Sequence, residues 1–75
     1  MKELLLYIAR SLVEHPDQVT VTEVPNGEEL TLELRVAPED MGKVIGRQGR
    51  IAKAIRTLVK AATVKDEKPV FVEIV

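Results

Sequence analysis

The chain has 75 residues, enough for one small domain in which folding buries about 60% of the surface that the unfolded chain exposes. It has no cysteine and one histidine, so it cannot build a disulfide framework, a zinc site or a nucleophilic triad. We therefore expect no enzyme activity, no metal, no cofactor and no small-molecule substrate. No apolar run reaches the roughly 20 residues of a membrane span, and the N-terminal segment lacks a signal-peptide pattern, which predicts a cytoplasmic protein.

The formal net charge of −1 hides a strong separation of charge along the chain. Residues 41–65 hold seven of the eleven basic residues and none of the twelve acidic ones. A basic helix surface that is merely solvated usually carries glutamates as i,i+4 partners, and this stretch has none. The segment therefore predicts a local anion-binding site, whereas the acidic remainder argues against indiscriminate binding of polyanions.

The first half of the chain predicts a helix followed by a β-hairpin. Residues 2–14 carry apolar side chains at helical spacing and end at a His-Pro pair, which closes a helix. Residues 18–24 are rich in β-branched side chains, and residues 30–36 alternate strictly between apolar and polar. The pair Asn26 and Gly27 between them favours a tight antiparallel turn.

The second half predicts two helices and a closing strand. Pro38 and the acidic pair Glu39 and Asp40 are typical of a helix start, where carboxylates interact with the positive end of the helix dipole. A longer helix begins at Arg50, with a predicted core stripe of Ile51, Ile55, Leu58, Val59 and Ala62. Residues 63–69 are a polar exit, and residues 70–75 read as a strand.

The order α-β-β-α-α-β constrains the topology. The connection before the last strand is long and helical, so we expect a right-handed crossover that places this strand parallel to its neighbour. The expected fold class is α+β, a three-stranded mixed sheet with three helices on one face. The other face should be open, with Thr31, Glu33 and Arg35 pointing there.

The stretch VIGRQGR, residues 44–50, contains one glycine more than a turn requires. Gly46 stands where the end of a helix favours a left-handed residue, and Gly49 directly precedes the next helix, whose first amides lack intrahelical partners. Without Cβ atoms at these positions, phosphates can approach the backbone closely. Arg47 and Gln48 at the tip can then reach phosphate or sugar oxygens.

This loop, with the Val-Ile before it and Ile51 after it, resembles the I-G-x-x-G-x-x-I signature of the KH domain. The helix and strand that precede the βααβ unit resemble the type II, bacterial arrangement of that fold. The resemblance covers residues 1–75 as a single domain. It implies that Gly46, Arg47, Gln48 and Gly49 clamp the phosphates of single-stranded RNA.

The resemblance also implies that the bases lie in a groove between the two core helices and the neighbouring strand. Candidates for the apolar floor of this groove are Val44, Ile45 and Ile51, although core packing also explains Ile51 and Ile55. Three basic residues close to the loop extend the expected phosphate track: Lys43, Arg50 and Lys53. Arg56 and Lys60 lie further along the helix, and solvation explains them best.

The resemblance further implies an RNA chaperone or post-transcriptional regulator, connected with cell-envelope growth and cell length, that acts with a second KH-domain protein. The small core and the 45% share of hydrophobic residues also favour a homodimer. Two alternatives remain open. One is a protein-protein adaptor with little affinity for RNA, and the other is a duplex DNA binder of the helix-turn-helix kind, with Arg50, Lys53 and Arg56 in the major groove. Base stacking on aromatic side chains is a poor mechanism here, because the chain has only Tyr7 and Phe71.

Overall fold

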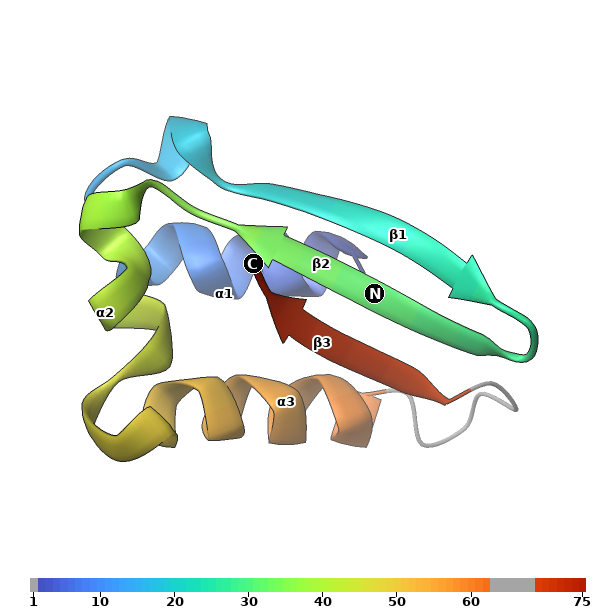
Figure 1. Ribbon diagram of the computed structural model, residues 1–75. Helices are drawn as coiled ribbons and strands as arrows, with labels where there is room; N and C mark the ends of the chain where they lie inside the picture. The colour runs from blue at the N-terminus through green and yellow to red at the C-terminus, as the bar shows by residue number, and fades with distance from the viewer. Residues whose placement is uncertain (1, 63–68) are drawn as a thin grey trace.

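The computed structural model describes residues 2–62 and 69–75, and its elements follow the predicted order α-β-β-α-α-β (Figure 1). The elements are α1 (Lys2–Leu12), η1 (Pro16–Gln18), β1 (Thr20–Asn26), β2 (Glu29–Arg35), η2 (Pro38–Asp40), α2 (Met41–Ile45), η3 (Arg47–Gly49), α3 (Arg50–Ala62) and β3 (Val70–Ile74). The expected polar exit at 63–69 lies outside the described residues except for Pro69. Within the described ranges, no helix has the length and apolar character needed to span a membrane.

The sheet is mixed, as expected, with the strand order β1-β2-β3. β1 pairs antiparallel with β2, and β2 pairs parallel with β3. Asn26 pairs with Glu29, so the hairpin loop consists of Gly27 and Glu28, one residue later than the predicted pair. Gly27 has a φ of 63°, a value that glycine adopts without the steric penalty of a Cβ.

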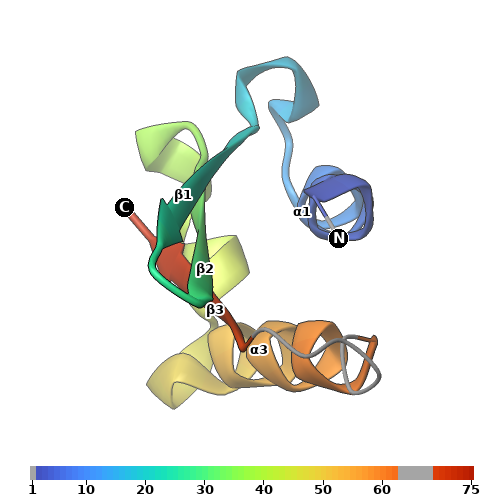
Figure 2. The same ribbon diagram turned by 90° about the vertical axis from the view of Figure 1, so that its right-hand side faces the viewer.

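One face of the sheet carries the core and the other is open. Leu32 and Leu34 of β2 are completely buried, together with Leu5 of α1 and Ile55 of α3. Figure 2 shows α1 and α3 on the same side of the sheet, so these two helices leave the opposite side open. The alternating residues Thr31, Glu33 and Arg35 belong to this uncovered side, so the predicted two-layer α+β arrangement is confirmed.

Two boundaries near the N-terminus differ from the prediction for a physical reason. α1 ends at Leu12 instead of residue 14, because the amides of Glu14 and His15 donate to the side chain of Asp40 and not to carbonyls of α1. β1 begins two residues later than predicted, since Pro16 opens the 3₁₀ turn η1.

The buried stripe of α3 is rotated relative to the predicted one. Ala52, Ile55 and Val59 are buried, whereas Leu58 is 54% exposed and Ala62 is also exposed. At 100° per residue, Leu58 lies about 100° around the helix from Val59. The sheet covers only one side of α3, so the prediction for Leu58 and Ala62 was wrong.

Candidate nucleic-acid interface

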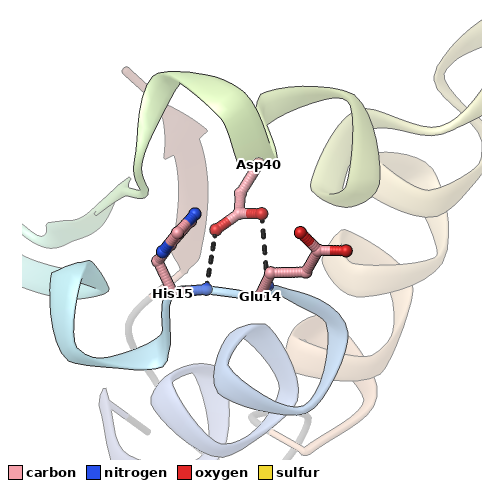
Figure 3. A group of neighbouring side chains, drawn as sticks. All are labelled: Glu14, His15 and Asp40. Atoms are coloured by element: carbon pink, nitrogen blue, oxygen red, sulfur yellow. Dashed lines mark hydrogen bonds between the residues drawn. The ribbon is translucent and has the colours of Figure 1, made fainter.

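A buried carboxylate fixes the start of α2, which leads into the glycine loop. Asp40 is only 1% exposed, and both of its oxygens accept backbone hydrogen bonds from the segment after α1 (Figure 3). The Glu14 amide donates to Oδ1 at 3.1 Å, and the His15 amide donates to Oδ2 at 3.0 Å. Asp40 makes no side-chain capping bond to α2. Its role is therefore to join the end of α1 to the beginning of α2, beyond the dipole role expected from the sequence.

Lys43 of α2, which the sequence predicts on the phosphate track, lies close to the carboxylates of Glu14 and Asp40. Its Nζ lies 2.7 Å from Glu14 Oε1 and 3.9 Å from Asp40 Oδ1. The hydrogen bond from Lys43, followed by the attraction of its charge, lowers the pKa of Glu14 below the ordinary 4.5. A phosphate that recruits Lys43 must therefore compete with Glu14.

Among the described residues, three side chains in this same region are close enough together to be ligands of one metal ion. One ligand atom from each of Glu14, His15 and Asp40 falls within 4.8 Å of the others. However, both Asp40 oxygens already accept amide hydrogen bonds, and the Lys43 ammonium supplies a positive charge. His15 Nε2 also lies 3.5 Å from Glu39 Oε2. Hydrogen bonds and ion pairs therefore explain why these side chains lie close together.

Gly46 at the end of α2 is required by backbone conformation and by packing. Its φ of 76° is positive as expected, but its ψ of 175° is extended and not left-handed helical. This region of backbone space is accessible almost only to glycine. A Cβ at Gly46 would overlap Cγ1 of Ile51 and lie 2.9 Å from the Ile51 backbone nitrogen. The first glycine therefore lets α2 and α3 meet closely.

Gly49 has a different environment. Its φ is 74°, and a Cβ added there would meet no atom within 4 Å, so the space beside it is open to a ligand. Gln48 between the glycines has φ 57° and ψ 25°, a left-handed conformation that is strained for a residue with a side chain. Strained backbone of this kind is concentrated at functional sites, which favours a binding role for the loop.

The hydrogen bonds of the loop leave two amides for a ligand. Gly46 N–H donates to Gly42 O at 2.8 Å, Gly49 N–H donates to Gly46 O at 3.2 Å, and Arg50 N–H donates to Arg47 O. None of these bonds uses the amides of Arg47 and Gln48. Both side chains are exposed, so backbone donors and long polar side chains occur together at the tip of the loop.

Basic side chains continue from the loop along α3. Arg47, Arg50 and Lys53 are exposed, and Arg50 Nη2 lies 3.5 Å from Gln48 Oε1. At 100° per residue, Lys53 and Arg56 lie within about 120° of Arg50 around α3 and share one side of it. The structure therefore places the loop and the predicted flanking residues on α3 in one basic surface.

Arg56 was not among the predicted RNA-binding residues, but the structure attaches it to the sheet. Its Nε donates to the carbonyl of Val72 in β3 at 3.2 Å. β3 is an edge strand of the sheet, and this bond links its outer side to α3. Solvation, the explanation that the sequence favoured for Arg56, is thus incomplete. No local sequence signal identifies such a contact, because its acceptor is a backbone atom 16 residues away.

The three predicted floor residues have different environments. Val44 is completely buried in the core, and Ile51 is partly buried and packed against the core. Ile45 is 37% exposed and directly precedes the loop. Only Ile45 among the three therefore offers a substantially exposed apolar side chain beside the loop.

Two features together define a KH domain of type II. They are a Gly-x-x-Gly loop between two helices and a mixed sheet in a chain whose elements follow the order α-β-β-α-α-β. The family profile described as "KhpA/KhpB, KH domain" matches residues 2–74. The chain belongs to this family, which is not a family of enzymes.

Several full-length relatives support the assignment. The chain is 65% identical to the protein named RNA-binding protein KhpA of Clostridium acetobutylicum and 64% identical to that of Clostridium perfringens, in both cases over 100% of each chain. The protein of the same name from Listeria monocytogenes is 52% identical, with 100% of this chain and 99% of the relative covered.

Solved structures with the same fold include two of the protein Era. A point mutant of Aquifex aeolicus Era, bound to GDP and aluminium fluoride, matches 97% of this chain with a TM-score of 0.66 and 21% identity. Era in complex with MgGDPNP and nucleotides 1506–1542 of 16S ribosomal RNA gives a TM-score of 0.67 at 21% identity. This chain covers 28% of each Era chain, and at this identity the likeness concerns the fold alone.

Proposed function

We propose that the chain binds single-stranded RNA through the loop Gly46–Gly49, which clamps the phosphate backbone. The observation that carries this proposal is the strained, exposed loop tip at the start of a basic helix. The amides of Arg47 and Gln48 and the positive end of α3 supply donors and potential to a phosphate that approaches beside Gly49. The relatives named RNA-binding protein KhpA support RNA as the ligand.

The neighbouring basic residues extend this contact. Arg50 and Lys53 are exposed and can neutralise the next phosphates. Lys43 can join only by leaving Glu14, so we expect it to contribute less than its distance from the loop suggests. The bases then lie between α2, α3 and β3, where Ile45 provides exposed apolar surface.

The size of the loop limits the affinity. A KH loop clamps about four nucleotides, so the chain should neutralise about two to four phosphates. For a single strand, each contact contributes about −0.7 to the slope of log K against log salt concentration. We therefore expect a shallow slope, between about −1.4 and −2.8, and micromolar binding by one copy. A slope of about −6 or steeper would contradict a single loop.

The direct test is a charge reversal at the loop tip with a matched control elsewhere. Arg47→Asp combined with Gln48→Asp keeps both glycines and places two carboxylates where a phosphate should lie. Arg10→Asp combined with Gln18→Asp makes the same residue changes at exposed positions of α1 and η1. Binding of labelled single-stranded RNA is measured for both variants with duplex DNA as competitor, and circular dichroism verifies their folding.

If the loop is the clamp, the loop variant loses RNA binding while the control retains most of it, and duplex DNA competes poorly. Equal losses in the two variants would mean that only net charge matters. Strong competition by duplex DNA would favour the helix-turn-helix alternative. Absence of RNA binding in the wild type would favour the adaptor alternative.

We further propose that the chain acts in the cytoplasm as an RNA chaperone or post-transcriptional regulator, together with a second, KhpB-like KH protein or as a homodimer. The proposed role includes cell-envelope growth and cell length. The exposure of Leu58 at 54% and of Tyr7 at 72% leaves apolar side chains on two helices for such an assembly. A second copy would add a second RNA site and raise the overall affinity. Mass measurement over a range of protein concentrations, with and without RNA, tests this assembly.

A further inference from the structure

The open face of the sheet combines exposed apolar side chains with carboxylates. In the strand register, Val24, Thr31 and Phe71 form one row across all three strands. Phe71 is 49% exposed and Val24 is 36% exposed, so both apolar side chains of this row are in part open to solvent. Aromatic side chains are enriched in surfaces that bind a partner protein.

Carboxylates lie on both sides of the apolar row. On one side of this row, Glu33 of β2 and Glu73 of β3 are direct cross-strand partners. On the other side lies Glu29, two residues before Thr31 in β2. Arg35 is the basic residue of this face within the described strands. Like charges directly opposite each other destabilise a sheet, so the pair formed by Glu33 and Glu73 has no evident structural benefit.

We propose that the open face of the sheet docks an arginine- or lysine-rich extended segment of a partner protein. An arginine side chain laid on the Phe71 ring gains a cation–π interaction. From there it reaches toward Glu73, two residues along the strand and about 6.6 Å away, and toward Glu33 on the neighbouring strand. A cationic segment also relieves the repulsion between the two carboxylates, which an uncharged or acidic partner cannot do.

The position of this face separates it from the proposed RNA site. Figure 2 shows the helix α3 on the helical side of the sheet, and the strand register places Glu29, Glu33 and Glu73 on the opposite, open side. The negative face repels RNA, so a nucleic acid is a poor occupant. The docking site therefore does not depend on whether the loop binds RNA.

The test uses an eight-residue peptide of alternating arginine and serine, with a glutamate and serine peptide as its opposite. Each peptide is titrated into the full ¹⁵N-labelled chain without RNA, and the amide shifts of the protein are followed. We expect the arginine peptide to shift Thr31, Glu33, Phe71 and Glu73, and the glutamate peptide to shift none of them.

Two variants identify the contacts. Glu33→Gln combined with Glu73→Gln should weaken arginine-peptide binding at least about threefold, the effect of two exposed ion pairs. Phe71→Thr keeps a strand-forming residue and the charge, and it should weaken binding about two- to fivefold through the lost cation–π contact.

The control, Glu23→Gln combined with Glu28→Gln, removes the same charge from the helical side of β1 and from the turn. It should change affinity by less than about twofold, since neither carboxylate lies on the open face. An equal loss in the control would overturn the proposal, because binding would then follow net charge alone. Shifts confined to α1 would also overturn it. Shifts of the open face that appear on concentrating the chain without peptide would assign the face to a second copy.

Discussion

Replacing Asp40 tests whether one buried carboxylate holds the two halves of the helical layer together. Asp40→Ala removes an acceptor for two backbone amides, and a hydrogen bond to a charged group contributes about 1.5–3 kcal/mol. Water can reach the freed amides in part, because Glu14 is exposed and His15 is half-buried. We therefore expect a loss of about 2–4 kcal/mol, a large share of the roughly 5–15 kcal/mol typical of a domain.

Urea unfolding followed by circular dichroism measures this loss, and hydrogen exchange locates it. The amides of Glu14 and His15 should lose protection in Asp40→Ala. Asp40→Asn should also be destabilised, since its NH₂ group would face an amide donor. Asp17→Ala is the control, because this carboxylate lies exposed in η1 and its removal should change stability by less than about 0.5 kcal/mol. If Asp40→Ala and Asp17→Ala unfold at the same urea concentration, the reasoning is refuted.

Three further outcomes follow from the site and the sheet. Gly46→Ala should cost about 3 kcal/mol or more, from overlap and from strained backbone, and Gly49→Ala about 1 kcal/mol from backbone conformation alone. Equal losses on urea unfolding would contradict the packing role of the first glycine. The pKa of Glu14, followed by NMR, should lie below 4.5 and rise toward that value in Lys43→Met. The ion pair between Glu14 and Lys43 stabilises the fold above pH 4.5, and this contribution is lost as the pH falls through the lowered pKa. An unchanged pKa in the variant would exclude the pairing. Glu73→Thr should raise stability by about 0.2–1 kcal/mol by removing a cross-strand repulsion, and a lower melting temperature would argue against that repulsion.

Much of the fold could be predicted because its signals are local. The strict alternation of residues 30–36 and the turn glycine Gly27 indicated the hairpin, and the long helical connection indicated a parallel third strand. The end of α1 was predicted two residues too late, because its limit depends on Asp40, which is 25 residues further along the chain than His15. The buried side of α3 was also set by tertiary packing, which Leu58 alone could not reveal.

The candidate site was predictable in its residue types but not in all of its contacts. The two glycines and the exposed tip follow from a short motif, and the structure gives each glycine a different environment. The overlap that excludes a side chain at Gly46 involves Ile51, five residues away on the next helix. The pairing of Lys43 with Glu14 joins segments 29 residues apart, so no spacing rule indicates it.

The parallel pairing of β2 with β3 has a consequence for the order of folding. The hairpin joins residues between 3 and 15 positions apart, such as Asn26 with Glu29 and Thr20 with Arg35. β2 and β3 instead join residues 40 positions apart, such as Leu34 with Ile74. Closing the longer loop is entropically harder, so we expect it to be the slower event. The glycine loop lies between the two strands that this closure joins, so a chain with only its hairpin formed has every residue of the proposed RNA site but not yet their arrangement.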